Sequence, residues 1–196
     1  MSFLKAEWRK LILVNYEVPP TVLEKYVPAG TELDLWKGKC YLSLVGFMFV
    51  NTKVKGIKIP FHVNFEEVNL RFYVKRLDEM ETKRGVTFIK EIVPRAAITF
   101  VANTVYKENY ETMPMKHIWF EDESSLNVIY EWEKLGKWNQ VSVNADPHPV
   151  ELVPGSEEEF ITEHYWGYAH GDENTSTEYE VTHPQWQTYK VRHFKV

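Results

Sequence analysis

The longest strand candidate in the chain reads FEEVNLRFYVKR over residues 65–76. Successive side chains of a β-strand point to opposite faces of the sheet. One face of this segment is therefore apolar, with Val68, Leu70, Phe72 and Val74. The other face is polar, with Glu67, Asn69, Arg71 and Tyr73. The alternation predicts a sheet protein whose apolar face packs in a core.

The polar face has two interpretations, and the residues alone leave both open. In an open sheet it meets water, whereas in a barrel it lines the interior. Burial would oblige Glu67 to find Arg71, another cation or a proton, because an unpaired buried carboxylate is costly. Positions 67 and 71 are separated by about 13 Å of strand, at about 3.3 Å per residue. A direct pair needs both side chains to lean together, unless Asn69 or a bridging ligand fills the space.

Most of the remaining chain also predicts β-structure, with turns at proline and glycine. Strands are expected at residues 8–16, 32–36, 41–50, 82–93, 116–121, 126–133, 137–144, 164–168, 177–182 and 187–195. The segment 86–91 is expected to pair with the polar strand, with Lys90 and Glu91 on opposite faces. Asp146-Pro-His-Pro149 predicts a rigid turn.

Helices are expected at three places. Residues 21–26 predict one short helix, and residues 95–106 predict the longest. Its apolar face would hold Ala96, Ala97, Phe100 and Val101. Ser156 and Glu159 form a capping-box pattern before a third. With no repeat or linker, we expect one domain over residues 1–196, mainly β (α+β), built as a single antiparallel barrel or cone with two or three short outer helices.

The composition is that of a globular protein, with 44% hydrophobic and 26% charged residues. The net charge of −5 argues against broad nucleic-acid binding. No apolar run approaches the roughly 20 residues of a membrane helix, and the opening residues do not form a secretory signal. The single cysteine, Cys40, predicts a buried thiol in a reducing compartment. We expect a cytoplasmic protein without nucleic-acid or membrane partners.

Pro114-Met-Lys116-His117 follows the longest predicted helix. A lysine in the wall of an apolar pocket loses its proton more readily and would attack a carbonyl to form a Schiff base. If it stays charged, it would bind an anionic group. Composition alone favours a simpler interpretation, in which Lys116 is solvated and His117 packs. No phosphate-binding loop, strong metal-ligand spacing or serine nucleophile signature is present, so we expect neither a cofactor nor a metal.

Several segments together resemble a widespread bacterial family of uncharacterised proteins. They are Trp8…Asn15-Tyr16-Glu-Val-Pro19, Tyr26-Val-Pro28-Ala-Gly30, Tyr41-Leu-Ser43-Leu-Val-Gly46-Phe47, Glu67-Val-Asn69-Leu-Arg71-Phe-Tyr73-Val, Arg84-Gly85-Val86, Tyr110…Pro114-Met-Lys116-His117 and His183-Pro184…Trp186. The resemblance spans nearly the whole chain. That family is similar in fold to the acetoacetate decarboxylase superfamily, which implies an antiparallel β-barrel or cone with outer helices and an internal pocket.

The resemblance also implies functional positions. In acetoacetate decarboxylases the first of two lysines after a proline forms the Schiff base, near a strand that carries glutamates. Glu67 matches the glutamate strand, whereas Met115 stands at the first lysine position and Lys116 at the second. We therefore expect the pocket to be shared with that superfamily, but not the decarboxylase activity.

Three functions remain open. In the first, the chain binds a small organic ligand with an anionic or carbonyl group, lined by Asn69, Arg71, Tyr73 and His117, with Arg71 orienting its oxygen atoms. In the second, it is a lyase of the decarboxylase, dehydratase or aldolase type, with Glu67 as acid/base and Lys116 as amine. In the third, it is a structural or partner-binding protein with a filled barrel. An exposed strand edge would also allow homo-oligomers.

Overall fold

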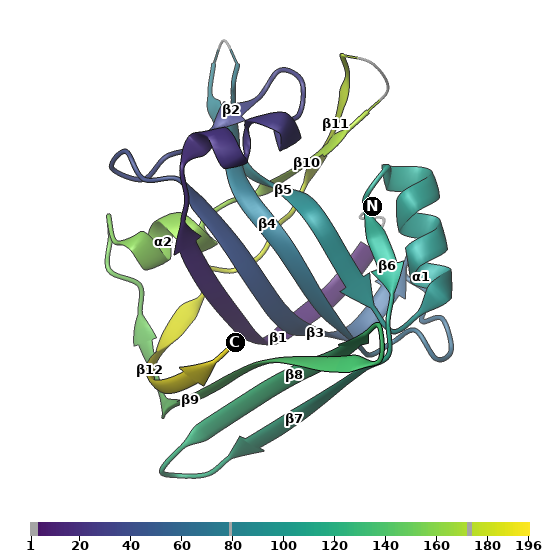
Figure 1. Ribbon diagram of the computed structural model, residues 1–196, viewed down its shortest axis with the longest axis vertical. Helices are drawn as coiled ribbons and strands as arrows, with labels where there is room; N and C mark the ends of the chain where they lie inside the picture. Colours follow the sequence, from purple (N-terminus) through teal and green to yellow (C-terminus); the bar gives the residue numbers. More distant parts are fainter. Residues whose placement is uncertain (1–3, 79, 172–173) are drawn as a thin grey trace.

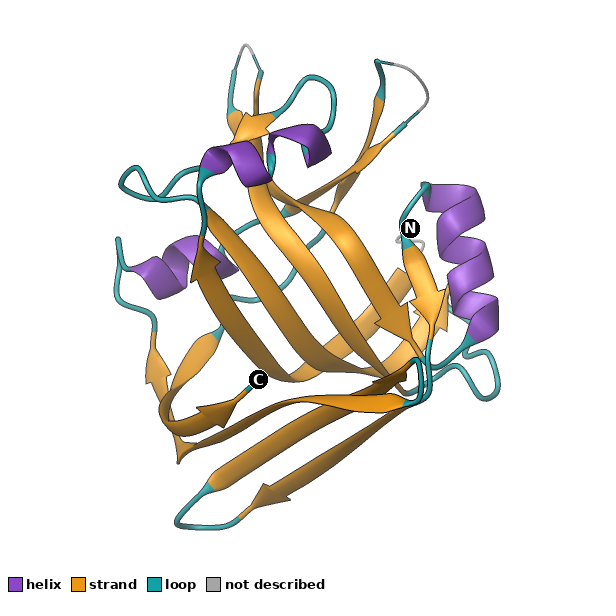
Figure 2. Cartoon of the chain, viewed as in Figure 1, coloured by secondary structure: helices purple, strands orange, loops and turns teal. Residues whose placement is uncertain are grey.

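The structure is a computed structural model that describes residues 4–78, 80–171 and 174–196. Its strands form two sheets that are mainly antiparallel (Figures 1 and 2). The larger sheet has the order β1-β3-β4-β5-β10-β11, with β2 paired to β4 and β6 paired to β5. The smaller sheet has the order β12-β9-β8-β7. The strands are β1 (Leu4–Glu17), β2 (Glu32–Leu33), β3 (Tyr41–Val54), β4 (Phe65–Leu77), β5 (Thr82–Val93), β6 (Tyr110–Thr112), β7 (Met115–Glu121), β8 (Leu126–Lys134), β9 (Lys137–Glu151), β10 (Trp166–His170), β11 (Ser176–Glu180) and β12 (Gln187–Lys195).

The mainly β class is confirmed, but the predicted closed barrel is wrong. After Pro114 the chain leaves the larger sheet, and β7 pairs with β8 instead. The smaller sheet lies across one end of the larger one (Figure 1). Apolar side chains join the two, namely Ile12, Val68 and Ile92 from the larger sheet and Leu126, Val128, Tyr130 and Val141 from the smaller. Gly46 allows the close approach, because a Cβ there would lie 2.9 Å from the Tyr130 ring.

The strand at the centre of the prediction is confirmed. β4 pairs antiparallel with β3 and with β5. Val68 packs toward the smaller sheet, while Phe72 and Val74 pack with Leu23. The apolar face predicted from the alternation is thus a core face.

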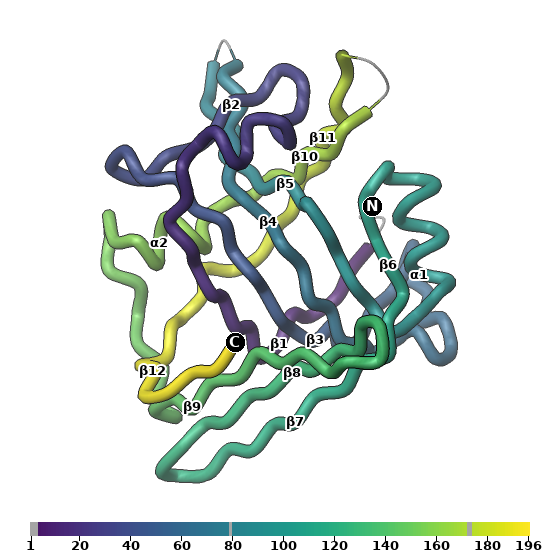
Figure 3. The backbone as a smooth tube through the Cα atoms, viewed as in Figure 1, coloured from purple at the N-terminus to yellow at the C-terminus, as the bar shows by residue number. Residues whose placement is uncertain are grey.

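The opposite face of β4 is covered by a different part of the chain. The segment between β11 and β12 crosses behind the larger sheet in the view of Figure 3. There Trp186 packs edge-on against Trp8 of β1, with ring centroids 6.0 Å apart. His183 stacks on Trp186 at 4.4 Å. This crossing shields one end of the polar face from water.

The helices are shorter than predicted. In place of one helix at 21–26 there are two 3₁₀ turns, η1 (Pro20–Val22) and η2 (Glu24–Tyr26). The longest helix divides into α1 (Ala96–Val101) and a π-helical segment, η3 (Ala102–Tyr106). The third helix, α2 (Glu157–Thr162), starts at Ser156 as the capping box predicts. Within the described ranges, no helix combines the length and apolar character needed to cross a bilayer.

Two local predictions are wrong. Phe100 does not face the core but is 71% exposed, and Ile98 packs inward instead. All four residues of the predicted face lie within α1, and Ala96, Ala97 and Val101 are exposed as well, because this helix packs on the sheet through Ile98. Asp146–Pro149 does not form a turn but lies within β9, paired to β12. Pro149 cannot donate to the sheet ladder, and register shifts beside Val191 in β12 accommodate the irregular pairing.

Candidate functional site

The polar face of β4 is buried. Glu67, Asn69 and Arg71 are 2%, 3% and 9% exposed. Their neighbours on β3 include Phe47, beside Glu67, and Val45, beside Asn69. Apolar clusters lie at both ends of the row, so these polar groups are removed from water and depend on one another.

Glu67 is held by two donors. The Asn69 amide donates to its Oε1 at 2.9 Å, and the Tyr110 hydroxyl donates to its Oε2 at 3.0 Å. Burial raises the pKa of Glu67 to about 7, although these two bonds and the charge of Arg71 act in the opposite direction. Glu67 therefore holds a proton far more readily than an exposed glutamate.

Two further glutamates join Glu67 in an acid cluster, defined here as Glu67, Glu91 and Glu108. Glu91 of β5 lies opposite Asn69 in register and is 2% exposed. Its pKa is raised by burial and by the charges of Glu67 and Glu108. Glu108 accepts a hydrogen bond of 2.9 Å from the Tyr179 hydroxyl, and burial raises its pKa to about 7. Like charges cannot all be ionised in so small a buried space, so the cluster retains protons near neutral pH.

Arg71 lies beyond Asn69 on the same face but forms no ion pair with Glu67 in the part of the chain that the structure describes. Its guanidinium carbon lies 5.8 Å from the centroid of the Tyr73 ring. Three buried polar atoms on β4 and β5 have no hydrogen-bond partner among the described residues, namely Arg71 Nε, Asn69 Oδ1 and Glu91 Oε2. Unpaired buried polar atoms are costly, and Asn69 and Glu91 are register partners, so this part of the two strands is suited to a polar guest.

Tyr73 forms the wall next to Arg71. Its hydroxyl shares a hydrogen bond of 2.7 Å with Ser43, which donates to Asn15 at 2.7 Å. The phenol is therefore fixed in place, and the face of its ring remains beside the guanidinium.

The structure does not bring Lys116 or His117 to this cluster, since both lie on β7 of the smaller sheet. The Lys116 side chain is 54% exposed, pairs with Glu131 at 3.2 Å and covers the ring of Trp138. His117 Nδ1 lies 2.6 Å from Glu66, on the opposite face of β4 from Glu67. Met115, which the sequence resemblance matches to the nucleophilic lysine, packs against the core between the sheets.

The site also contains residues that the sequence prediction missed. One indication of Glu91 was present in the sequence, because the segment 86–91 was expected to pair with the strand that carries Glu67. Glu108 and Tyr110 follow η3, and Tyr179 lies on β11. No short-range pattern connects these three positions to β4, so only the chain topology reveals them.

The donor set favours proton and oxygen chemistry. Within the described ranges, no group of three or more His, Cys, Asp or Glu side chains is arranged to hold a metal ion. The buried polar face offers instead the Arg71 cation, the Asn69 amide and the carboxyl groups of the acid cluster, whose pKa values are raised. Such a set can bind an oxygen-rich organic group and exchange a proton with it.

This two-sheet fold is that of the acetoacetate decarboxylase-like proteins. An acetoacetate decarboxylase from Legionella pneumophila has a TM-score of 0.57 and 12% sequence identity, covering 86% of this chain and 61% of that one. An acetoacetate decarboxylase-like enzyme from Sphingomonas wittichii RW1 has a TM-score of 0.58 and 12% identity, covering 90% and 69%. The enduracididine biosynthesis enzyme MppR, solved with the condensation product of pyruvate and imidazole 4-carboxaldehyde, has a TM-score of 0.55 and 12% identity, covering 81% and 60%. At this identity the likeness concerns the fold alone.

The chain itself belongs to the DUF2071 family, described as an uncharacterized conserved protein, whose model matches residues 5–196. The uncharacterized protein YqjF of Bacillus subtilis is 31% identical over 114 residues. The match covers 58% of this chain and 46% of YqjF, so less than half the length of that relative is represented. The resemblance noted in the sequence is confirmed for both the family and the fold.

Proposed function

We propose that the protein binds a small organic acid or carbonyl compound beside the acid cluster, on the buried face of β4 and β5. The observation that carries this proposal is Arg71, a 9% exposed cation whose Nε is buried without a hydrogen-bond partner and which forms no ion pair among the described residues. A buried cation without a bonded partner is unfavourable unless an anion reaches it. A ligand carboxylate or carbonyl oxygen supplies that partner.

The neighbouring groups complete the recognition. Asn69 fixes Glu67 through its Nδ2 and leaves its Oδ1 without a partner, so a ligand hydroxyl or enol can donate there. Tyr73 supplies a flat apolar wall against the ligand carbons. A guest of a few carbon atoms with two oxygen functions matches these groups.

The acid cluster makes binding depend on pH. An anionic guest beside Glu67 and Glu91 requires these carboxyl groups to be protonated, because like charges repel at short range. Burial raises the pKa of Glu67 to about 7. Affinity for an organic anion should therefore be highest below pH 7 and fall as the pH rises above it.

The proposal is tested by calorimetric titration of acetoacetate and of pyruvate into the wild-type protein at pH 6 and pH 8. We expect binding at pH 6 that weakens at pH 8. Arg71→Met should lower the affinity by about tenfold to a hundredfold, as for the loss of a charge-assisted hydrogen bond. Arg71→Lys retains the charge but not the planar fork, and should give an intermediate loss.

Lys75→Met is the matched control. Lys75 lies on the same strand and face but pairs with Glu32 at 3.3 Å, near the surface. The Lys75→Met variant should bind acetoacetate and pyruvate with the wild-type affinity. Failure of the folded wild type to bind either acid, or equal binding by Arg71→Met, would refute the proposal.

A second candidate function is lyase chemistry, with Glu67 as the acid or base. It is favoured by the pKa of about 7, which suits proton transfer at neutral pH. Since Lys116 is exposed on the other sheet, this reaction would proceed without the Lys116 amine. Consumption of acetoacetate followed by NMR, lost in Glu67→Gln while binding is retained, would establish it.

A further inference from the structure

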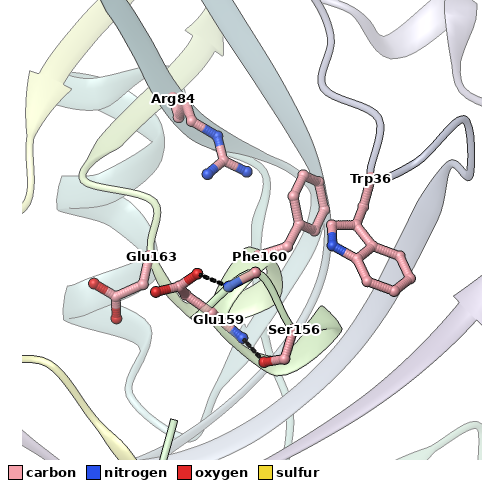
Figure 4. A pocket seen from close by; sticks show the side chains of 7 residues that line it. Trp36, Arg84, Ser156, Glu159, Phe160 and Glu163 are labelled. Atoms are coloured by element: carbon pink, nitrogen blue, oxygen red, sulfur yellow. Dashed lines mark hydrogen bonds between the residues drawn. The ribbon is translucent and has the colours of Figure 1, made fainter. Parts of the chain in front are cut away.

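A separate pocket of about 390 Å³ opens beside α2 and the start of β5. Its lining combines one cation, two acids and two aromatic rings, as Figure 4 shows. The lining residues are Trp36, Arg84, Gly155, Ser156, Glu159, Phe160 and Glu163. This volume is typical of pockets for small organic ligands.

Arg84 is fixed on one side only. Its Nε donates to Asp34 at 2.7 Å, and its guanidinium carbon lies 4.7 Å from the centroid of the Phe160 ring. Its two terminal nitrogens donate no hydrogen bond to any group in the described ranges. They form a planar fork of the kind that binds a carboxylate through two parallel bonds.

The two acids of the pocket are not equivalent. Glu159 is engaged in the capping of α2, because its Oε2 accepts from the Gly155 N–H at 2.7 Å and its own N–H donates to Ser156 at 3.1 Å. Glu163 accepts a hydrogen bond from the Tyr165 hydroxyl through Oε2. The other oxygen, Glu163 Oε1, is buried and has no partner. No ion pair joins Arg84 to Glu159 or Glu163 among the described residues, so cation and acid remain separate anchors.

Aromatic rings complete the lining and divide this pocket from the acid cluster. Phe160 lies 5.5 Å from Tyr73 and 5.2 Å from His164, measured between ring centroids. Tyr73 and His164 are 4.8 Å apart. These three rings form a wall with Arg84 on one side and Arg71 on the other, while Trp36 lines the pocket.

We propose that this pocket binds a zwitterionic amino acid with an apolar or aromatic side chain. The ligand carboxylate pairs with the free fork of Arg84, the ammonium group donates to Glu163, and the side chain packs against Trp36 and Phe160. The separation of cation from acid distinguishes such a ligand from one with a single charge. The site is distinct from the one under Proposed function and does not depend on it.

The test is a calorimetric titration with three matched probes. They are L-phenylalanine, 3-phenylpropionate, which lacks the amine, and 2-phenylethylamine, which lacks the carboxylate. We expect L-phenylalanine to bind at least about tenfold more tightly than either analogue, because each analogue leaves one charged anchor unpaired.

Variants assign the anchors. Glu163→Gln should weaken L-phenylalanine by about tenfold and leave 3-phenylpropionate unchanged. Arg84→Lys, which keeps a cation beside Asp34, should weaken L-phenylalanine and 3-phenylpropionate alike. Glu158→Gln, an exposed acid on the same helix, is the matched control and should bind as the wild type.

Three outcomes would overturn the inference. Equal binding of 3-phenylpropionate would make the pocket a simple anion site, and equal binding of 2-phenylethylamine a cation site. Failure of the folded protein to bind L-phenylalanine would remove the site altogether. Arg71→Met should not change the affinity for L-phenylalanine, because Arg71 does not line this pocket. A failure of this inference can therefore be told apart from a failure of the proposed function.

Discussion

The larger sheet holds two groups of buried acids that differ in their contact with a cation. Asp34 is 7% exposed and accepts a bond of 2.7 Å from Arg84, with His164 Nε2 at 3.2 Å from the same oxygen. Burial alone would raise the pKa of Asp34, but these two bonds lower it below its ordinary value. Glu67 is 2% exposed and has no bonded cation among the described residues, and its pKa rises to about 7. Direct pairing with a cation thus keeps Asp34 ionised, whereas Glu67, which lacks such a pair among the described residues, holds a proton near neutral pH.

The largest expected effect is the change of stability with pH, which tests the difference in protonation between Asp34 and the acid cluster. The pKa values of Glu67 and Glu108 are about 7 in the folded protein, against an ordinary value of 4.5. The folded state therefore holds protons that the unfolded state has lost, and stability should fall as the pH rises from 4.5 to about 7. At about 1.4 kcal/mol per pH unit for each group, the two glutamates together should cost about 5 kcal/mol of stability between pH 5 and pH 8, measured by urea denaturation.

Glu91→Gln should make the decline with pH shallower, because the pKa of Glu91 is itself raised by burial and by the charges of Glu67 and Glu108, and this residue no longer contributes a proton. Glu158→Gln, on an exposed helix face, should retain the wild-type profile. A wild-type profile that is flat from pH 5 to pH 8 would contradict the protonated cluster.

A smaller effect is expected from breaking the ion pair. Arg84→Met leaves Asp34 buried beside His164, whose pKa burial lowers to about 4, so that the ring is neutral at pH 7. We expect about 2 kcal/mol of destabilisation, less than for a fully buried pair because the Arg84 side chain is 36% exposed. Chemical denaturation at pH 7 measures it, with partial recovery in Arg84→Lys. A change below about 0.5 kcal/mol would place this pair among ordinary surface contacts.

The smallest effect is expected outside both groups. Lys116→Met removes an exposed pair with Glu131, which contributes no more than about 0.5 kcal/mol. Borohydride treatment in the presence of acetoacetate should leave no adduct, as intact mass would reveal, with an authentic acetoacetate decarboxylase trapped in parallel. An adduct that disappears in Lys116→Met would instead establish amine chemistry on the smaller sheet.

Predictions from short-range patterns succeeded where local chemistry dominates. The capping box at Ser156 requires only an interaction three residues away, and it starts α2 as expected. The strand over 65–77 follows from a period of two. The turn expected at Asp146–Pro149 failed because pairing with β12 outweighs the local preference of proline. The prediction of a single barrel was wrong for a related reason. No local pattern indicates which strands pair after Pro114, where the chain passes from the larger sheet to the smaller one.

The alternation of polar and apolar residues was enough to predict that Glu67, Asn69, Arg71 and Tyr73 share one strand face, because a period of two is a local property of the chain. Long-range contacts decide that this face is buried and that Glu91, Glu108 and Tyr179 meet it. Burial and pKa depend on which groups the whole chain brings within a few ångströms, and those groups come from β5, the segment after η3 and β11. Long-range pairing also decides the position of Lys116. Because β7 pairs with β8 in the smaller sheet and its alternate side chains face water, Lys116 lies away from the acid cluster.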